Sequence, residues 1–113
     1  MLSKKYLLNK KEVFLLKREG KVVDKNPFFN TIAFKIPEES VSKFTFIISK
    51  KVSRKAVERN KVKRVMAEAI RVNIDKFDKG YYIGFYLKEK ATDKSYEELF
   101  DLVNKEISKI SIF

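Results

Sequence analysis

The stretch from Phe46 to Asn73 limits what this chain can fold into more than any other. It opens as an apolar, strand-like run, passes through a basic turn, and continues as a helix that we expect to span residues 53–73, with Ser53 as its N-cap. At about 100° per residue, one side of this helix is an apolar stripe of Val62, Val65, Met66, Ala69 and Val72. The opposite side carries Asn60, Lys63, Arg64 and Arg71, with the small residues Ala56 and Ala67 between them. The sequence therefore predicts a helix that packs on a sheet and presents a basic side outward.

Positive charge is concentrated in the same stretch. Residues 50–71 hold nine basic and two acidic side chains, which gives +7 of the chain's net charge of +11. The nine are Lys50, Lys51, Arg54, Lys55, Arg59, Lys61, Lys63, Arg64 and Arg71. Residues 1–25 add a net +5, residues 26–49 are neutral, and residues 72–113 have a net charge of −1. A helix side that serves only solubility usually mixes both signs, so this one-sided charge indicates contact with the phosphates of a nucleic acid.

The composition excludes several classes of protein. The chain of 113 residues is expected to form one domain, residues 1–113. It has no cysteine and no histidine, which excludes disulfide frameworks, zinc fingers, cysteine nucleophiles and histidine-based acid–base catalysis. Three glycines, at positions 20, 80 and 84, cannot supply a glycine-rich phosphate loop. We therefore expect neither a catalytic residue nor a metal ligand in the protein itself. No apolar run approaches the ~20 residues of a membrane span, so a cytoplasmic protein is the simplest expectation.

The segments around the basic helix supply the scaffold. Residues 1–8 read as a basic arm and residues 9–19 as a first helix, opened by an Asn9–Glu12 capping box. Strands are expected at Val22–Val23, Phe28–Ile36, Phe44–Ser49 and Tyr81–Leu87. The second and third of these should pair as an antiparallel hairpin, because the loop between them is short.

Two further signals complete the predicted architecture. Gly84, inside the last strand, indicates a bulge or the close approach of another segment. Ser95 and Glu98 form a second capping box, which opens a near-neutral amphipathic helix. The order helix, two or three strands, helix, strand, helix predicts a two-layer α+β domain with a mixed sheet.

The nature of the nucleic acid follows from the aromatic strands. Aromatic side chains beside a basic helix favour RNA or unpaired strands over duplex DNA, because rings stack on free bases while Lys and Arg hold the backbone. No helix and turn precede the basic helix, as a helix-turn-helix DNA reader requires. Phe14 is a candidate for base stacking, whereas the aromatic residues at 81–86 are expected in the core. A structural RNA-binding protein of the ribosome type and a DNA-binding regulator are the alternatives.

The segment Ser49–Arg64, SKKVSRKAVERNKVKR, resembles the signature of the bacterial ribonuclease P protein component. In that family a strand ends in Ser-Lys-Lys and the next helix contains Ala-Val-x-Arg-Asn-x-x-Lys-Arg; here these are residues 49–51 and 56–64. The likeness extends over nearly the whole chain, since Phe14 lies in the first helix, Gly20 follows it, and Ser95–Glu98 matches the family's usual Ser/Thr-Tyr-Glu-Glu helix start.

This resemblance implies a function and a feature of the fold. The family's protein is the accessory subunit of a large catalytic RNA that removes the 5′ leader from precursor tRNA by hydrolysis, with magnesium ions held mainly by the RNA. The implied partners are that catalytic RNA and the leader of precursor tRNA, with no membrane and no DNA. The resemblance also implies a left-handed βαβ crossover, against the usual right-handed rule.

Matched positions carry the family's roles onto this chain. The residues that would face the catalytic RNA are Arg59, Asn60, Lys61, Lys63 and Arg64. The residues that would extend this contact are Lys50, Lys51, Arg54, Lys55 and Arg71. The residues that would bind the leader, in a cleft between the first helix and the sheet, are Phe14, Lys17, Arg18, Ile32 and Phe34.

The chain departs from the family pattern at four places. Lys61 replaces the usual third residue of Arg-Asn-Arg, which keeps the charge and loses the bidentate guanidinium. Ala67 stands where an arginine is common, and Ser53–Lys55 replaces a frequent Gly-Asn turn. Lys17 or Arg18 replaces a second aromatic of the first helix, which shifts leader binding from stacking toward charge.

Overall fold

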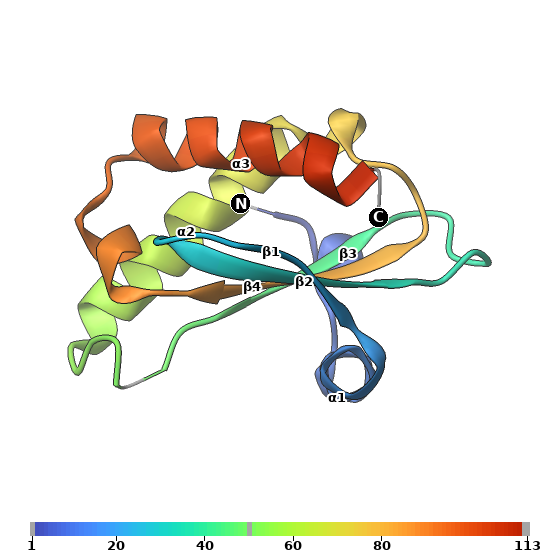
Figure 1. The fold of residues 1–113 in the computed structure, drawn as a ribbon, viewed down its shortest axis with the longest axis horizontal. Coiled ribbons are helices and arrows are strands. Elements are labelled where there is room, and N and C mark those ends of the chain that lie inside the picture. Colours follow the sequence, from blue (N-terminus) through green and yellow to red (C-terminus); the bar gives the residue numbers. More distant parts are fainter. Residues whose placement is uncertain (1, 50, 112–113) are drawn as a thin grey trace.

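The computed structural model describes residues 2–49 and 51–111. Within these residues the chain forms three α-helices and one four-stranded sheet (Figure 1). The helices are α1 (Lys10–Glu19), α2 (Ala56–Val72) and α3 (Tyr96–Ser111). The strands are β1 (Lys21–Lys25), β2 (Phe29–Lys35), β3 (Lys43–Ile47) and β4 (Tyr81–Leu87). The α+β class and the mixed sheet are confirmed.

The strand order is β1-β2-β4-β3, so the last strand in sequence is central in the sheet. β4 pairs antiparallel with β2, with Phe29 opposite Leu87, and parallel with β3, with Phe44 opposite Ile83. The predicted hairpin between the strands at 28–36 and 44–49 is therefore wrong. β4 separates them because its side chains are buried on both faces of the sheet, as a central position requires.

The parallel pair of β3 and β4 needs a long connection, and α2 provides it. The β3–α2–β4 unit is therefore the βαβ crossover of this fold. The resemblance to the family implies that this crossover is left-handed.

Alternating side chains of β2 and β4 face two separate cores. The larger core lies between the sheet and the helices α2 and α3, and its fully buried members include Phe29, Ala33, Met66, Ile70, Ile83, Phe85, Leu99 and Val103. The smaller core lies under α1 and contains Leu16, Ile36 and Tyr82, with Ile32 and Phe34 packed against it. Figure 1 shows α3 above the sheet and α1, seen end-on, below it, while α2 slants upward past the strands toward α3. Helices thus cover both faces, and the domain has a third layer beyond the two that were expected.

Gly84 is the point at which α1 meets the sheet. A Cβ atom at this position would lie 3.0 Å from Cδ2 of Leu16 and 3.2 Å from Cγ1 of Ile32. The close approach predicted from a glycine inside a strand is confirmed, and the approaching segment is α1.

The N-terminal residues belong to the folded domain. Leu2 is buried in the larger core, and residues Lys4–Tyr6 form a single 3₁₀ turn. Leu7 forms a parallel bridge with Phe44, and the Leu8 N–H donates to the Phe44 carbonyl at 3.0 Å. The segment predicted as a basic arm therefore lies along the edge of β3, where it satisfies backbone groups that would otherwise be unpaired.

Both predicted capping boxes are confirmed. Asn9 and Glu12 exchange backbone–side-chain hydrogen bonds of 2.9 Å at the start of α1. Ser95 and Glu98 do the same at the start of α3, at 3.2 Å in each direction. Each box needs only residues three apart, which is why the sequence specifies it directly.

The start of α2 differs from the prediction. The helix begins at Ala56, and its N-cap position is Lys55, which makes no side-chain capping bond. Ser53 lies outside the helix because its hydroxyl donates to Glu58 at 2.6 Å and accepts from the Lys55 N–H at 3.3 Å. The serine therefore tethers the preceding turn to the first turn of α2, rather than capping the helix.

The apolar stripe of α2 is also shifted at its C-terminal end. Val62, Met66 and Ala69 are buried as predicted, and Val65 packs partly buried against the same core. Ile70 is fully buried, whereas Val72 is 49% exposed. The expected stripe missed Ile70 because α2 packs against α3 as well as the sheet, which widens its buried side.

One carboxyl group lies inside the larger core. Glu106 of α3 is 2% exposed and accepts a hydrogen bond of 2.6 Å from the Thr31 hydroxyl of β2. Lys109 lies 3.6 Å from Glu106 and 3.1 Å from Asp24 of β1. Burial is the main cause that raises the pKa of Glu106, to about 7. These contacts join α3 to β1 and β2.

Candidate nucleic-acid interface

The packing of α2 determines which of its polar side chains reach solvent. Because Val62, Met66 and Ile70 face the core, Asn60, Lys61, Arg64 and Arg71 are exposed, and Lys63 is half-buried beside them. The loop before the helix contributes three more exposed cations: Lys51, Arg54 and Lys55. The predicted residue Lys50 lies outside the described residues. The structure thus places one predicted set of RNA-binding residues on a continuous side of α2 and its preceding turn.

The cations of this side fall into two groups. Among the described residues, six form no salt bridge, namely Lys51, Arg54, Lys55, Lys61, Lys63 and Arg64. Arg71 is engaged, since its Nε donates to Oε2 of Glu68 at 2.9 Å and a second bond joins its other branch to the same carboxylate. Hydrogen bonding to Arg71 lowers the pKa of Glu68 to about 2. Arg71 therefore offers less charge to a partner than its position on the helix suggests.

Arg59 also serves the fold. Its Nη1 donates a 2.8 Å hydrogen bond to the Ser53 carbonyl, across the turn that precedes α2. With the Ser53–Glu58 bond, this contact fixes the turn against the helix. The turn replaces the family's frequent Gly-Asn pair, and it needs no residue of positive φ.

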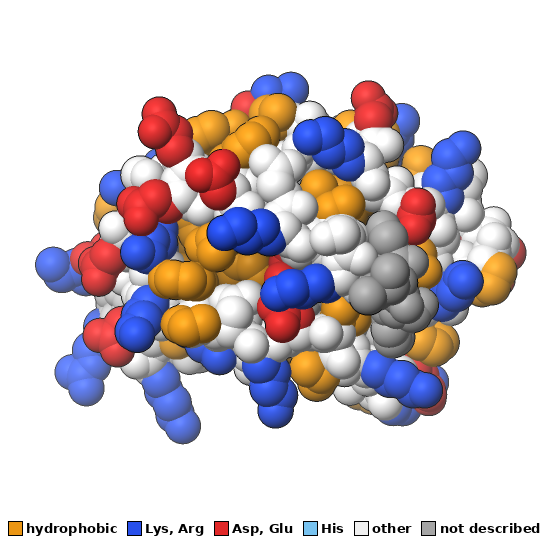
Figure 2. All heavy atoms as spheres, turned by 45° about the horizontal axis from the view of Figure 1, so that its top comes forward, with side chains coloured by type: hydrophobic (Ala, Val, Ile, Leu, Met, Phe, Trp, Pro, Cys, Tyr) orange, Lys and Arg blue, Asp and Glu red, His pale blue; other side chains and the backbone are white. Residues whose placement is uncertain are grey.

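The surface over α3 has a different charge pattern. On the face over α3, acidic and basic side chains are interspersed around apolar ones, while long basic side chains project along the lower margin (Figure 2). Pairs such as Lys94 with Glu98 at 3.2 Å contribute to this mixture. A face of mixed sign attracts polyanions weakly, so the α2 side is the favoured contact surface.

The predicted leader-binding residues do not form one pocket. Phe14 is 64% exposed and, two residues from the buried Leu16, lies on the far side of α1 from the sheet. The guanidinium of Arg18 lies 5.8 Å from the centre of the Phe14 ring, and Lys17 is exposed. Ile32 and Phe34 lie on the sheet face that α1 covers. The first three residues therefore form an outer surface of α1, and the other two help to anchor the helix.

The same sheet face holds three further candidates that the sequence did not single out. Asn30 of β2 is opposite Tyr86 of β4, and Tyr86 is opposite Ile47 of β3. All three are half-buried, and Oδ1 of Asn30 is enclosed without a hydrogen-bond partner. They lie one cross-strand row beyond Gly84, where Leu16 of α1 meets the sheet. Asn30 alternates with Ile32 and Phe34 along β2, so the sequence places it on the same sheet face. Its neighbours Tyr86 and Ile47 follow only from the strand register, which the sequence does not specify.

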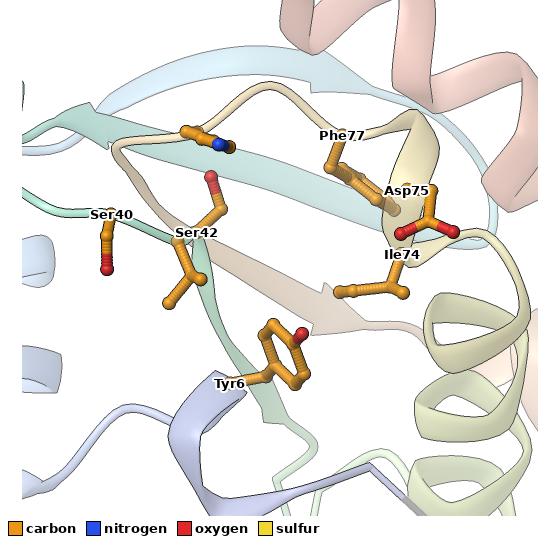
Figure 3. Close-up of a pocket in the computed structure, with 8 residues that line it drawn as sticks. Tyr6, Ser40, Ser42, Ile74, Asp75 and Phe77 are labelled. Carbon is orange, nitrogen blue, oxygen red and sulfur yellow. The ribbon is translucent and has the colours of Figure 1, made fainter.

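A small polar pocket on another side has a structural role. Its volume is about 160 Å³, and Figure 3 shows Tyr6, from the N-terminal segment, facing Ser42 and Ile74 across it. The Ser42 hydroxyl donates to the Asp78 carbonyl and accepts from the Tyr81 N–H at 3.1 Å. These bonds join the entry of β3 to the entry of β4.

No metal-binding cluster is found in the part of the chain that the structure describes, where no three acidic side chains converge. Within the same residues, no helix is long and apolar enough to cross a membrane.

Fold and surface together define a small α+β protein with a basic helical side suited to RNA. A sequence model of the family described as Ribonuclease P matches residues 2–111. The chain is 34% identical to the ribonuclease P protein component of Rickettsia peacockii over 110 residues, which cover 92% of each chain. It is 40% identical to that of Fusobacterium nucleatum over 81 residues, 72% of this chain and 68% of the relative. The chain belongs to the ribonuclease P protein family, whose members are the accessory subunit of an RNA-based endonuclease that processes tRNA.

Solved structures agree on the fold. The RNase P protein from Thermotoga maritima superposes with a TM-score of 0.80, covering 92% of this chain and 96% of its own. The Staphylococcus aureus RNase P protein superposes with a TM-score of 0.78, covering 94% of each chain. Because the sequence identities are 23% and 22%, these two matches support the fold alone.

Proposed function

We propose that this protein binds the catalytic RNA of ribonuclease P through the basic side of α2 and holds the single-stranded 5′ leader of precursor tRNA on the α1 side of the sheet. The observation that carries the proposal is the set of six basic residues on and before α2 that form no salt bridge among the described residues. Unpaired cations on a rigid helix can neutralise phosphates without first breaking internal ion pairs. The protein would act in the cytoplasm, where precursor tRNA is transcribed.

The leader would use a surface that differs from the predicted one. The row of Asn30, Tyr86 and Ile47 supplies an aromatic ring, an apolar side chain and an unpaired acceptor on one sheet face. Such a combination suits stacking and hydrogen bonding to unpaired bases. Phe14, Lys17 and Arg18 would contact the strand where it passes α1.

In this proposal, magnesium ions are bound by the RNA. The hydrolysis would need metal ions close to the scissile phosphate, and the described part of the protein gathers no three carboxylates to hold one. The catalytic RNA would hold the ions, while the protein would add affinity for the substrate.

Reconstitution tests the proposal. The protein alone should not cleave precursor tRNA, whereas the protein with its cognate catalytic RNA should allow cleavage at magnesium concentrations at which the RNA alone is inactive. A protein that changes neither leader affinity nor magnesium requirement would overturn the proposal. Co-sedimentation with ribosomal subunits, without an effect on tRNA processing, would instead support the ribosome-type alternative.

Single substitutions test the α2 surface. Lys63→Ala and Arg64→Ala should each weaken binding to the catalytic RNA and reduce the slope of log Kd against log salt by about one. Lys105→Ala, at an exposed position of α3, is the matched control and should leave the slope unchanged. Equal slopes for all three variants and the wild type would contradict the assignment of this surface.

A further inference from the structure

A hollow of about 740 Å³ lies between the N-terminal segment and the side of α2 that carries the predicted RNA-binding residues. Four apolar residues form its wall: Leu2, Leu7, Phe46 and Ala67. Its polar lining residues are Lys4, Asn60, Lys63, Arg64 and Glu68. The hollow therefore combines an apolar interior with cations at its margin.

The walls of the hollow are fixed by the fold. Leu2 is buried in the larger core, and Leu7 is bridged to Phe44 of the neighbouring strand. The Phe46 ring is stacked on Phe85, with centroids 5.9 Å apart and planes within 9°. A site with these walls is formed before any ligand arrives, which reduces the entropy lost on binding.

Ala67 keeps the hollow open. It lies three residues after Arg64 and seven after Asn60, so all three lie on one stripe of α2. A longer side chain here would enter the space that the alanine leaves. This position is one of those at which the chain departs from the family pattern, where an arginine is common.

The charges around the hollow favour one class of occupant. Lys4, Lys63 and Arg64 form no salt bridge among the described residues, whereas Glu68 is bound to Arg71. An apolar space with a cationic margin fits a flat, uncharged ring attached to an anionic group, which is the chemistry of a nucleotide in an unpaired RNA strand. An uncharged apolar peptide would gain nothing from the three cations.

We propose that the hollow accepts one unpaired base of the bound RNA, packed against Phe46 and Leu7, with its phosphates on Lys63 and Arg64. The proposal rests on the proposed function, since it assigns part of the RNA contact to base insertion. The contact is distinct from phosphate neutralisation, because removing it lowers affinity at every salt concentration by the same factor.

Ala67→Leu tests the proposal without changing the charge of the protein. Filling the hollow should raise the Kd for the catalytic RNA at least about fivefold, the lower end of what stacking of one base contributes. The slope of log Kd against log salt should stay that of the wild type. Ser108→Leu, at an exposed position of α3, does not line the hollow and should bind as the wild type does.

Ultraviolet crosslinking of the protein–RNA complex gives a second readout. Short-wave irradiation should join an RNA base to the peptide that contains Phe46 or Leu7, and Ala67→Leu should abolish that crosslink. Thermal unfolding of both leucine variants shows whether the fold is intact. A Kd of Ala67→Leu within twofold of the wild type, or crosslinks that omit both peptides, would overturn the proposal. Failure of the wild type to activate the catalytic RNA would instead overturn the proposed function.

Discussion

At the scale of single residues, the structure separates side chains that hold the fold from those left for a partner. Arg59 and Arg71 belong to a sequence run of nine cations, yet each is engaged with groups of the protein itself. Lys63 and Arg64 are in the same run and form no salt bridge among the described residues. A sequence shows the number of cations, whereas only the fold shows how many of them are available to phosphates.

Glu106 should make the stability of the protein depend on pH. The pKa of Glu106 is about 7 in the folded state and 4.5 ordinarily. Between pH 4.5 and 7 the folded protein therefore binds more protons than the unfolded chain. The free energy of unfolding should therefore fall as pH rises from about 4.5 to 7. Glu106→Gln, which can accept from Thr31 and has no charge, should flatten this dependence. It should be about 1 to 2 kcal/mol more stable than the wild type at pH 8.

Denaturant unfolding across this pH range measures the effect, and Glu97→Gln, at an exposed position of the first turn of α3, serves as the control. Asp24 and Lys109, the charged neighbours of Glu106, have pKa values shifted away from the window, lowered and raised respectively. An identical pH dependence for wild type and Glu106→Gln would show that Glu106 is ionised in the fold throughout.

At the scale of elements, α1 has two sides with different duties. Leu16 is fully buried against Gly84, and Glu12 accepts hydrogen bonds of 2.9 Å from Lys43 and from the Tyr82 hydroxyl. These contacts orient the helix on β3 and β4. The other side of the helix presents Phe14, which contributes nothing to either core.

This division predicts opposite results for two substitutions in one helix. Leu16→Ala should lower the free energy of unfolding by about 2 to 4 kcal/mol, because it removes a buried side chain at the contact with the sheet. Phe14→Ala should change stability by less than about 0.5 kcal/mol and weaken binding of single-stranded leader RNA. Thermal unfolding and binding of a short leader oligonucleotide measure the two effects. If Phe14→Ala unfolds as easily as Leu16→Ala, the exposed position assigned to the ring is wrong.

At the scale of the whole molecule, charge should dominate the affinity for RNA. If the six unpaired cations on and before α2 each neutralise one phosphate, the slope of log affinity against log salt should be about −4 to −5. Titration of the catalytic RNA between low and physiological salt measures this slope. A slope shallower than about −2 would mean that most of the basic side does not touch the RNA backbone.

What could be predicted from the sequence was local. The two capping boxes, the bounds of α1 and the buried residues Val62, Met66 and Ala69 depend on positions within a few residues of one another. The pairing of β4 with β2 and β3 could not be predicted, because the partners of a strand are chosen by burial across the whole sheet. The exposed position of Phe14 and the burial of Ile70 likewise depend on neighbours far away in the chain.

The central position of β4 bears on how the protein is made. Synthesis proceeds from the N-terminus, so β1, β2 and β3 leave the ribosome before the strand that joins them. Until Tyr81–Leu87 emerges, β2 and β3 lack the strand that pairs with both of them, and Leu16 has no Gly84 to pack against. The nascent chain is thus expected to complete its sheet only after Tyr81–Leu87 has left the ribosome. During that interval its cations face the ribosomal RNA, the first polyanion that the chain meets.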